Sequence, residues 1–317
     1  MKITIIGPGI MPIPPTGWGA VEILIWDSKN ALEKLGHEVD IVNTQSPVEI
    51  IQQVNAFRPD FVHIQYDDFI ELYPYIQYPC AITSHFGYLE QPEKWDYYGE
   101  RIAKPFNRIQ PNVFCLSDGI KGVYGRVLSI PSKHLFVTPN GVNINEFTFT
   151  KTAKYSDRSL YLAKIDYRKR QHMFQSIDSL WYAGNYSDQR FDKSKNYLGE
   201  WSKETLYKEL TNYGNLVLLS DGEAHPLVCM EALAAGLGVV VTEWGAANLD
   251  MNKDFISVIP ESKVSDIDYV ESQIVTNREY SVNNREEIYS YAQQFDWVNI
   301  IRDTYIPTIE KIIQQEN

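Results

Sequence analysis

The sequence predicts an α/β protein built from two units, each with a parallel sheet that is covered by helices on both faces. Strand-like runs rich in β-branched residues alternate with helix-like stretches, which is typical of such sheets. The alternation occurs twice, on either side of a polar stretch at residues 148–159. A length of 317 residues also agrees with about two domains of roughly 150 residues each. A cleft between two such units is a favoured ligand site.

The first unit is expected to begin with a buried strand, and its first helix is expected to follow a loop rich in Pro and Gly. Apolar residues recur at helical spacing over residues 20–35, and Gly36 follows where a C-cap glycine belongs. The expected strands are residues 2–6, 38–42, 61–64, 81–83, 113–116 and 135–138, and the expected helices are 20–35 and 47–57.

The second unit is expected to repeat the alternation and to end in an amphipathic helix. The expected strands are residues 159–163, 180–183, 216–219 and 239–242, and the expected helices are 169–177, 203–212 and 226–235. Residues 296–314 carry apolar side chains at spacings of three and four, and we expect this last helix to bend near Pro307. The predicted domains are therefore residues 1–150 and 151–294, followed by a C-terminal helix at 295–317.

The composition argues against some classes of binding partner and favours one cellular compartment. With 29 basic and 41 acidic side chains the net charge is −12, which argues against nucleic acid and anionic lipid as partners. Three widely spaced cysteines (Cys80, Cys115 and Cys229) without a C-x-x-C motif favour a reducing cytoplasm over a disulfide framework or a zinc site. The N-terminus lacks the core of a signal peptide, and the longest apolar run, residues 232–241, is too short to span a bilayer. We expect a soluble cytoplasmic protein and leave open both peripheral membrane contact and the oligomeric state.

Two pairs of glycines precede the first expected helix. Gly7 and Gly9 follow the first strand, but Pro12 stands where a dinucleotide fingerprint needs its third glycine, which argues against a nicotinamide cofactor. Gly17 and Gly19 directly precede the helix, where small residues let backbone N–H groups approach an anion such as phosphate. A flexible turn is the alternative interpretation of this second pair.

Two glutamates near the fourth expected strand of the second unit are separated by seven residues. Glu223 lies in the loop before the predicted helix at 226–235, and Pro226 suits the first turn of that helix. Glu231 lies on the helix among apolar neighbours, where a carboxylate is costly unless it forms a hydrogen bond. A ribose diol would satisfy it, and a glutamate on a solvent-facing helix surface is the alternative.

This segment resembles the retaining glycosyltransferases of family 4, which have the GT-B fold. Their signature is two glutamates separated by seven residues, then small residues and a glycine, here Glu223, Glu231 and Gly236. The resemblance implies two Rossmann-like parallel-sheet domains facing across a cleft. It also implies that Glu231 holds the ribose hydroxyls of a nucleotide and that Glu223 contacts hydroxyls of the donor sugar. The backbone at Leu227 and Val228 would meet the diphosphate at the helix N-terminus.

A second segment, residues 162–169, resembles the Gly-Arg…Lys phosphate motif of the same family. Lys169 matches the family's lysine, whereas Ala163 and Lys164 replace its glycine and arginine, and Arg170 replaces the glycine after the lysine. Lysine is a point charge, so Lys164 would lose the bidentate phosphate contact of arginine. Weaker resemblances extend over nearly the whole chain, and the last of them, at residues 295–297, corresponds to the entry of a final helix that crosses back to the first domain. The other matching pieces are residues 35–39, 62–63, 83–85, 117 and 137–142 with Phe147.

Histidines and cations supply the remaining candidates. The resemblance gives His85 a contact to the donor sugar near the reacting centre, and a buried, hydrogen-bonded histidine is the alternative. His225 follows Glu223 closely and would either touch sugar or phosphate or hold the loop. Lys164 and Lys169 are the expected phosphate ligands, because a diphosphate leaving group needs neutralising charge. Arg168 and Arg170 are expected to be solvated cations at a helix start.

The sequence predicts no metal site. The acidic pairs Asp67-Asp68 and Asp266-Ile-Asp268 are expected at the surface, and the six histidines form no His-x-x-x-His pair.

The resemblance therefore implies a retaining glycosyltransferase of the hexosyltransferase type that needs no cofactor. It would transfer a sugar from a UDP- or GDP-linked donor to a hydroxyl of an acceptor such as a glycan. The expected catalytic residues are Glu223, His85, Lys164 and Lys169, and the expected donor-binding residues are Glu231, Gly17, Gly19, Leu227, Val228 and His225. A sugar-nucleotide epimerase of the same fold and a non-catalytic protein that binds nucleotide sugars or glycans are the alternatives. The Tyr-rich stretch at 66–98 would either stack on a glycan acceptor or pack internally.

Overall fold

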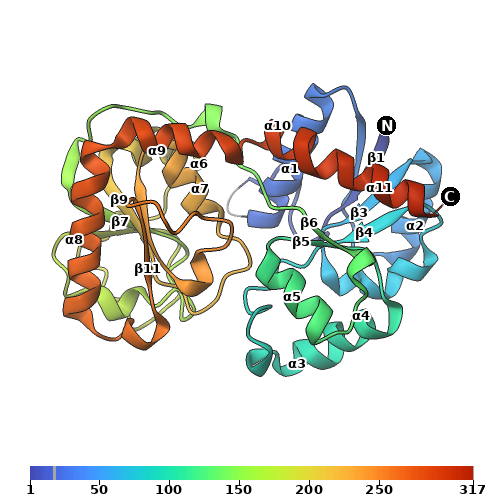
Figure 1. Ribbon diagram of the computed structural model, residues 1–317, viewed down its shortest axis with the longest axis horizontal. Helices are drawn as coiled ribbons and strands as arrows, with labels where there is room; N and C mark the ends of the chain where they lie inside the picture. Colours follow the sequence, from blue (N-terminus) through green and yellow to red (C-terminus); the bar gives the residue numbers. More distant parts are fainter. Residues whose placement is uncertain (17–18, 317) are drawn as a thin grey trace. The chain divides into compact units, whose positions relative to one another are not determined.

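A computed structural model describes residues 1–16 and 19–316 of the chain (Figure 1). The chain forms two compact units, of which one comprises Met1–Gly141 with the residues from Trp297 onward, and the other Val142–Asp296. The sequence places the first boundary at residue 150, and the structure groups residues 142–150 with the second unit. The reason is local, because the backbone N–H of Val142 donates to the carbonyl of Phe295 at 2.9 Å and Val142 pairs with Asp296 in a parallel bridge.

The sheet of the first unit is parallel throughout, with strand order β2-β1-β3-β4-β5-β6. Its strands are β1 (Lys2–Ile6), β2 (Glu38–Val42), β3 (Phe61–Ile64), β4 (Cys80–Ile82), β5 (Val113–Cys115) and β6 (Leu135–Val137). These strands confirm the predicted ones to within a residue or two. Buried strands of a parallel sheet are apolar on both faces, and here Ile3, Ile5 and Ile6 of β1 are completely buried.

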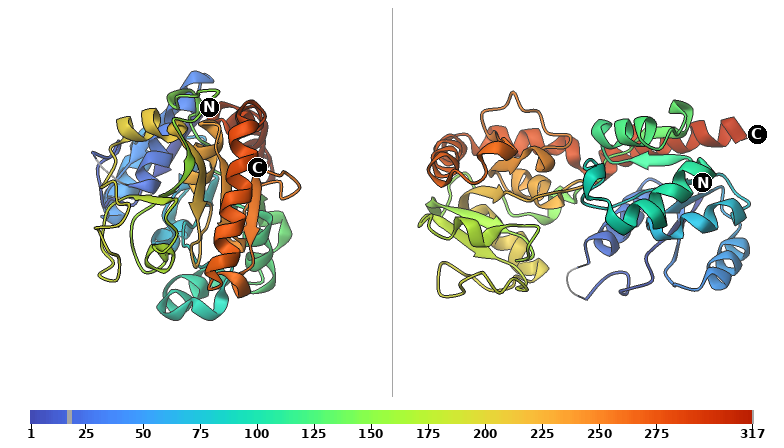
Figure 2. Two further views of the ribbon diagram at one scale, coloured as in Figure 1. Left: turned by 90° about the vertical axis from the view of Figure 1, so that its left-hand side faces the viewer. Right: turned by 90° about the horizontal axis from the view of Figure 1, so that it is seen from below.

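Helices cover both faces of this sheet (Figure 2). They are α1 (Ala20–Lys34), α2 (Pro47–Phe57), α3 (Asp96–Tyr98), α4 (Lys104–Ile109), α5 (Asp118–Arg126), α10 (Trp297–Ile300) and α11 (Ile306–Glu316). Helix α10 packs beside α1. Between α10 and α11 the chain widens into a π-helical segment at Ile301–Tyr305. Pro307 lies in the first turn of α11, separated from this segment by one residue, and the bend that the sequence predicts there stays a prediction.

The second unit contains another parallel sheet, with strand order β11-β10-β9-β7-β8. Its strands are β7 (Tyr155–Leu162), β8 (Leu180–Ala183), β9 (Tyr213–Leu218), β10 (Gly238–Thr242) and β11 (Ile256–Ile259), and its helices are α6 (Lys203–Glu209), α7 (Leu227–Ala234), α8 (Ile267–Asn283) and α9 (Arg285–Ala292). Helix α8 packs across β7, β9, β10 and β11, and α7 packs against β9, β10 and α9.

The predicted helix at residues 169–177 is wrong. This stretch contains turns and only a short 3₁₀ segment, Gln171–Phe174, because Arg170 has a left-handed backbone with φ of 58° that interrupts any helix there. Helix α8 and strand β11 had no assignment from the sequence. The buried face of α8 includes Asn277 and Ser281 beside Val270 and Ile274, so its apolar periodicity is weak.

Strand order reverses once in each sheet, between β1 and β3 in the first unit and between β7 and β9 in the second. The carboxyl ends of the two strands that flank such a reversal diverge into loops on opposite faces of the sheet, which leaves a crevice for a ligand. The loops after β1, β3, β7 and β9 are therefore the places where the fold favours function.

Within the part of the chain that the structure describes, no helix is both long enough and apolar enough to cross a bilayer. Cys80, Cys115 and Cys229 are each buried as free thiols.

Candidate active site

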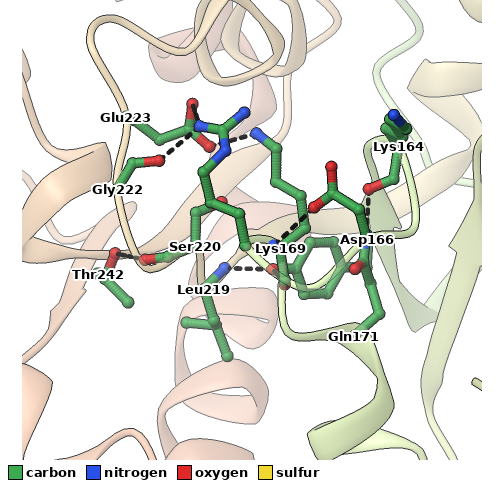
Figure 3. Close-up of polar contacts among 11 residues, drawn as sticks. Lys164, Asp166, Lys169, Gln171, Leu219, Ser220, Gly222, Glu223 and Thr242 are labelled. Atoms are coloured by element: carbon green, nitrogen blue, oxygen red, sulfur yellow. Dashed lines mark hydrogen bonds and ion pairs between the residues drawn. The ribbon is translucent and has the colours of Figure 1, made fainter. Parts of the chain in front are cut away.

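A buried ion-pair cluster lies at the reversal point of the second sheet (Figure 3). Lys169, in the turn after β7, pairs through its ammonium with the carboxylate of Glu223, in the loop after β9. The guanidinium of Arg168 lies 3.3 Å from the same carboxylate and donates to the carbonyl of Gly222 at 2.6 Å. The structure thus brings together two expected site residues, Lys169 and Glu223, and adds Arg168.

The two loops are held together by backbone and side-chain hydrogen bonds. Tyr161, on β7, donates its hydroxyl to the carbonyl of Lys169 and accepts the backbone N–H of Leu219 at 2.8 Å. The N–H of Asp221 donates to the carbonyl of Arg168 at 2.8 Å, which ties the loops a second time. Because the bond to Leu219 and the bond between Asp221 and Arg168 each join residues more than fifty positions apart, no local sequence pattern predicts that Tyr161 organises the site.

The charge of this cluster follows from its surroundings. Burial alone would raise the pKa of Glu223, but the charges of Lys169 and Arg168, with the hydrogen bond from Lys169, lower it more, so that the pKa lies below its ordinary value. Glu223 is therefore ionised at neutral pH and its side chain is only 8 % exposed. Two cations face one carboxylate, so the cluster carries a net positive charge that suits an anion.

Arg170 is not solvated, contrary to the expectation from the sequence. Its guanidinium bonds to the carboxylates of Asp221 and Glu261, and its side chain is 15 % exposed. Arg168 likewise contacts Glu223 instead of standing in water. The φ of Arg170, 58°, lies in the left-handed region that glycine adopts without strain. The ion pairs offset the cost of an arginine in this conformation.

Lys164 lies apart from the ion-pair cluster (Figure 3). It is exposed at the start of the loop after β7, and its backbone carbonyl accepts a hydrogen bond of 2.9 Å from the side chain of Gln171. The structure therefore keeps Lys164 in the same loop as Lys169 but does not bring it to Glu223.

Helix α7 begins at Leu227, immediately beyond Glu223. Its N-cap residue is Pro226, and among the described residues this N-cap supplies no side-chain hydrogen bond to the first turn. Leu227 and Val228 therefore present their backbone at a helix N-terminus that attracts anions. Glu231 lies on the same helix, half-buried. Gly236 follows the helix with φ of 81°, as a C-cap glycine does.

His225 is buried in the loop between Glu223 and α7. Its Nε2 lies 3.1 Å from the side-chain nitrogen of Asn248. This contact joins the loop to another loop after β10, which agrees with a structural role for His225. The expected contact of His225 with sugar or phosphate stays a prediction.

The first unit contains a cavity of about 410 Å³ at its own reversal point. Residues from the loops after β1, β3 and β4 line it, among them Pro8, Gln65 and His85. His85 directs its Nε2 to the side-chain oxygen of Gln65 at 2.8 Å. His85 thus lies at the carboxyl end of β4, as the sequence predicts.

A chain of hydrogen bonds determines which nitrogen of His85 carries the proton. Thr83 donates its hydroxyl hydrogen to the carbonyl of Phe114 and therefore accepts from Nε2–H of His63 at 2.8 Å. Nδ1 of His63 is then an acceptor, and the amide nitrogen of Gln65 donates to it at 3.3 Å. The amide oxygen of Gln65 faces His85, so Nε2 of His85 is protonated and its Nδ1 is left as a hydrogen-bond acceptor.

Burial keeps both histidine rings neutral. It lowers the pKa of His63 to about 3 and the pKa of His85 to about 4. A neutral His85 in this tautomer accepts a hydrogen bond from a ligand hydroxyl through Nδ1 but does not supply positive charge.

The glycines before α1 are described in part. Gly17 lies outside the described residues. Gly19 is the N-cap residue of α1, and a Cβ there would stand 2.7 Å from a carboxylate oxygen of Glu22. The absence of a side chain at Gly19 makes room for Glu22, a reason for this glycine that the sequence did not reveal.

Asp67 differs from the surface acid that the sequence predicts, whereas Asp266 and Asp268 are exposed, as predicted. Asp67 is buried, and its carboxylate accepts hydrogen bonds from the hydroxyls of Ser84 and Tyr98. Asp266 caps α8 by accepting the backbone N–H of Tyr269 at 3.2 Å. Across residues 1–16 and 19–316, no three His, Cys, Asp or Glu side chains gather in a way that would hold a metal ion.

No protein-family model and no curated protein matches the chain. Solved structures do match over almost the whole of both chains. HepE of Anabaena, in complex with UDP and glucose, is 14 % identical with a TM-score of 0.72, covering 98 % of this chain and 99 % of its own. Sucrose-phosphate synthase of Thermosynechococcus elongatus is 14 % identical with a TM-score of 0.78, and each chain is covered completely. AviGT4, a glycosyltransferase involved in avilamycin A biosynthesis, is 16 % identical with a TM-score of 0.70, covering 99 % of this chain and 98 % of its own.

These likenesses concern the whole architecture, because both parallel sheets and their helices are included. The chain therefore has the GT-B fold, with two Rossmann-like parallel-sheet units.

Proposed function

We propose that this protein is a retaining glycosyltransferase of family 4 that transfers a sugar from a nucleoside diphosphate sugar to an acceptor hydroxyl. The observation that carries the proposal is the cluster of Lys169, Arg168 and Glu223 at the reversal point of the second sheet, beside the N-terminus of α7. A cation pair and an uncapped helix N-terminus together suit a diphosphate. The fold it shares with HepE, which was solved with UDP and glucose, supports the same conclusion.

The roles of the residues follow from their positions. Lys169 and the backbone at Leu227 and Val228 would neutralise the diphosphate as it departs, which is the step that most needs charge stabilisation. Glu223, ionised and held by two cations, would accept hydrogen bonds from hydroxyls of the donor sugar. Glu231 would bind the ribose diol. We assign no metal to the reaction.

Two further residues have proposed contacts with the donor. Lys164 begins the same loop as Lys169 and would reach the diphosphate from the solvent side. His85, through its acceptor Nδ1, would bind a sugar hydroxyl. For His225, Gly17 and Gly19 we propose the roles that the resemblance implies, which are contacts with the nucleotide sugar.

Thermal-shift measurements with nucleotides test the donor class. UDP or GDP should raise the melting temperature in proportion to the logarithm of its concentration above the dissociation constant. Product analysis with the responding nucleotide sugar then separates the alternatives. Transfer requires an acceptor, an epimerase acts on the donor alone, and a binding protein releases no nucleoside diphosphate. Absence of any nucleotide response over the millimolar range contradicts the proposal.

A further inference from the structure

The cavity of the first unit has an acidic wall that the donor chemistry does not use. Glu22, in the first turn of α1, lines this cavity and is 5 % exposed. Asp67 also lines it and is 8 % exposed. Asp68 lies beside them and pairs with Arg101 at 2.9 Å. Three acidic residues, one from the first turn of α1 and two from the segment after β3, thus line the same cavity.

Two of the three carboxyl groups already have partners. Asp67 accepts from the hydroxyls of Ser84 and Tyr98, and Asp68 accepts from Arg101. Glu22 differs, because none of the described residues forms a hydrogen bond or an ion pair with its carboxylate. The carboxylate lies against Gly19 at the N-terminus of α1, which offsets part of the cost of its burial, and a bound cation would offset the rest.

The remainder of the lining supplies no compensating charge. Among the described residues that line the cavity there is no lysine and no arginine. His85 is neutral, since burial lowers its pKa to about 4. A negatively charged ligand would therefore be repelled, and a neutral one could donate hydrogen bonds to Glu22 but would leave its charge uncompensated.

Aromatic rings form the other walls. Tyr66, Phe86, Tyr97 and Tyr98 all line the cavity, and Phe86 stacks on Tyr98 with ring centroids 4.0 Å apart. Tyr97 is 69 % exposed, so its ring lies at the rim and is open to a ligand. Aromatic faces beside carboxylates suit a ligand ring that carries a cationic group. The ligand ring stacks on the aromatic faces, and the cation is attracted to them by cation–π interaction. The volume of about 410 Å³ lies within the range of small-ligand sites.

We propose that this cavity binds the sugar acceptor and that the acceptor carries a protonated amine beside its hydroxyls, as an amino sugar or an aminocyclitol does. This inference rests on the proposed function and names its acceptor class. The ammonium pairs with Glu22, and the ring lies against Tyr97.

Binding of three matched sugars to the full chain tests this. Glucosamine carries the amine, glucose replaces it with a hydroxyl, and N-acetylglucosamine removes its charge. In ligand-detected NMR at pH 6.5 and 150 mM salt, glucosamine should bind at least about tenfold more tightly than the other two, because a buried charge pair is worth more than about 1.4 kcal/mol. Equal binding of glucosamine and glucose overturns the proposal.

Two isosteric substitutions locate the effect. Glu22→Gln should abolish the preference for glucosamine and leave the binding of glucose unchanged. Glu93→Gln, which removes the same charge from an exposed residue of the same unit outside the cavity lining, should retain the preference. An unchanged preference in Glu22→Gln contradicts the proposal. If Glu22→Gln does not fold, the comparison of the three sugars on the natural protein still decides it.

The outcome is separable from that of the donor site. Binding of UDP or GDP is measured on the same samples, and it depends on Lys169 and Glu223 in the second unit. A nucleotide response without a preference for the amine rejects the acceptor class alone. A preference for the amine without a nucleotide response rejects the proposed transfer alone.

Discussion

Glu223 lies at the centre of the ion-pair cluster in the second unit. It is an ionised carboxylate with two cations at hydrogen-bonding distance, and it lies beside a helix N-terminus. If a diphosphate binds, Lys169 gains a second anionic partner while Glu223 keeps Arg168. The pair would therefore be rearranged rather than broken, which explains how a stable ion pair and a ligand site can share a lysine.

Lys169→Ala separates the structural role of the pair from its chemical role. We expect this variant to lose about 1–3 kcal/mol of unfolding free energy, because Arg168 alone cannot fully compensate the buried Glu223 carboxylate. Lys169→Met combined with Glu223→Gln removes both charges of the buried pair and should regain most of that stability. Urea unfolding measures both. A double variant less stable than Lys169→Ala would show that the loss does not come from an uncompensated charge.

The buried ring of His63 predicts how the free energy of unfolding depends on pH. Its pKa falls from 6.5 in the unfolded chain to about 3 in the fold, because burial disfavours the charged ring. The unfolded state therefore binds a proton that the folded state does not bind. The contribution of His63 to the free energy of unfolding is complete above pH 6.5 and is lost as the pH falls toward 3. The slope is about 1.4 kcal/mol per pH unit for one proton.

His63→Gln should flatten the acid limb by that amount between about pH 6 and pH 4. Glutamine keeps one donor and one acceptor for Thr83 and Tyr305, so the hydrogen bonds of His63 have a substitute. Urea unfolding at pH 6.5, 5.5 and 4.5 gives the slopes of both proteins. Identical slopes would contradict the assignment of a neutral buried ring.

At the scale of elements, the sequence predicts the strands better than the helices. Runs of β-branched residues such as 238–242 define strands without ambiguity, whereas α8 buries Asn277 and Ser281, which hydrogen-bond within the core and hide its periodicity. The predicted helix at 169–177 failed because Arg170 has a left-handed backbone, a feature that side-chain patterns do not encode.

The candidate site is predictable in its motifs but not in its contacts. Lys169 and Glu223 each follow from a resemblance to a local motif, yet their pairing depends on the order of β7 and β9 in the sheet. Tyr161 and Arg168 join the same cluster across more than fifty residues, so no local signal identifies them. The burial of Asp67 and Glu22 comes from tertiary packing alone, so the sequence does not distinguish them from surface acids.

The turn that ends α7 offers a test at this scale. Gly236 has φ of 81°, and a Cβ there would stand 2.8 Å from the ring of Phe149. Gly36 ends α1 with φ of 84°, but nothing lies within 4 Å of its Cβ position. Gly36→Ala should therefore cost about 1 kcal/mol from backbone strain, and Gly236→Ala should cost clearly more because the ring must also move. Thermal unfolding compares them, and equal losses would mean that the α7 turn is not as tightly packed as described.

At the scale of the whole molecule, each unit places its polar site at the point where strand order reverses. In the first unit this point holds His85 and the acidic cavity, and in the second it holds Lys169 and Glu223. Each unit thus offers one candidate ligand site, and the proposed reaction needs two substrates. The acidic net charge of −12 does not conflict with this, because a single diphosphate needs only a local group of cations.

Release of nucleoside diphosphate from a UDP- or GDP-sugar, in the presence of an acceptor, tests the central claim most directly. The natural protein should turn over, and Lys169→Ala and Glu231→Ala should each lose two or more orders of magnitude, about 3 kcal/mol of transition-state stabilisation. The control is Lys208→Ala, which removes an exposed cation from the last turn of α6, at the opposite edge of the sheet where β9 begins, and it should retain full turnover. Turnover of both site variants at the rate of the control would contradict the account.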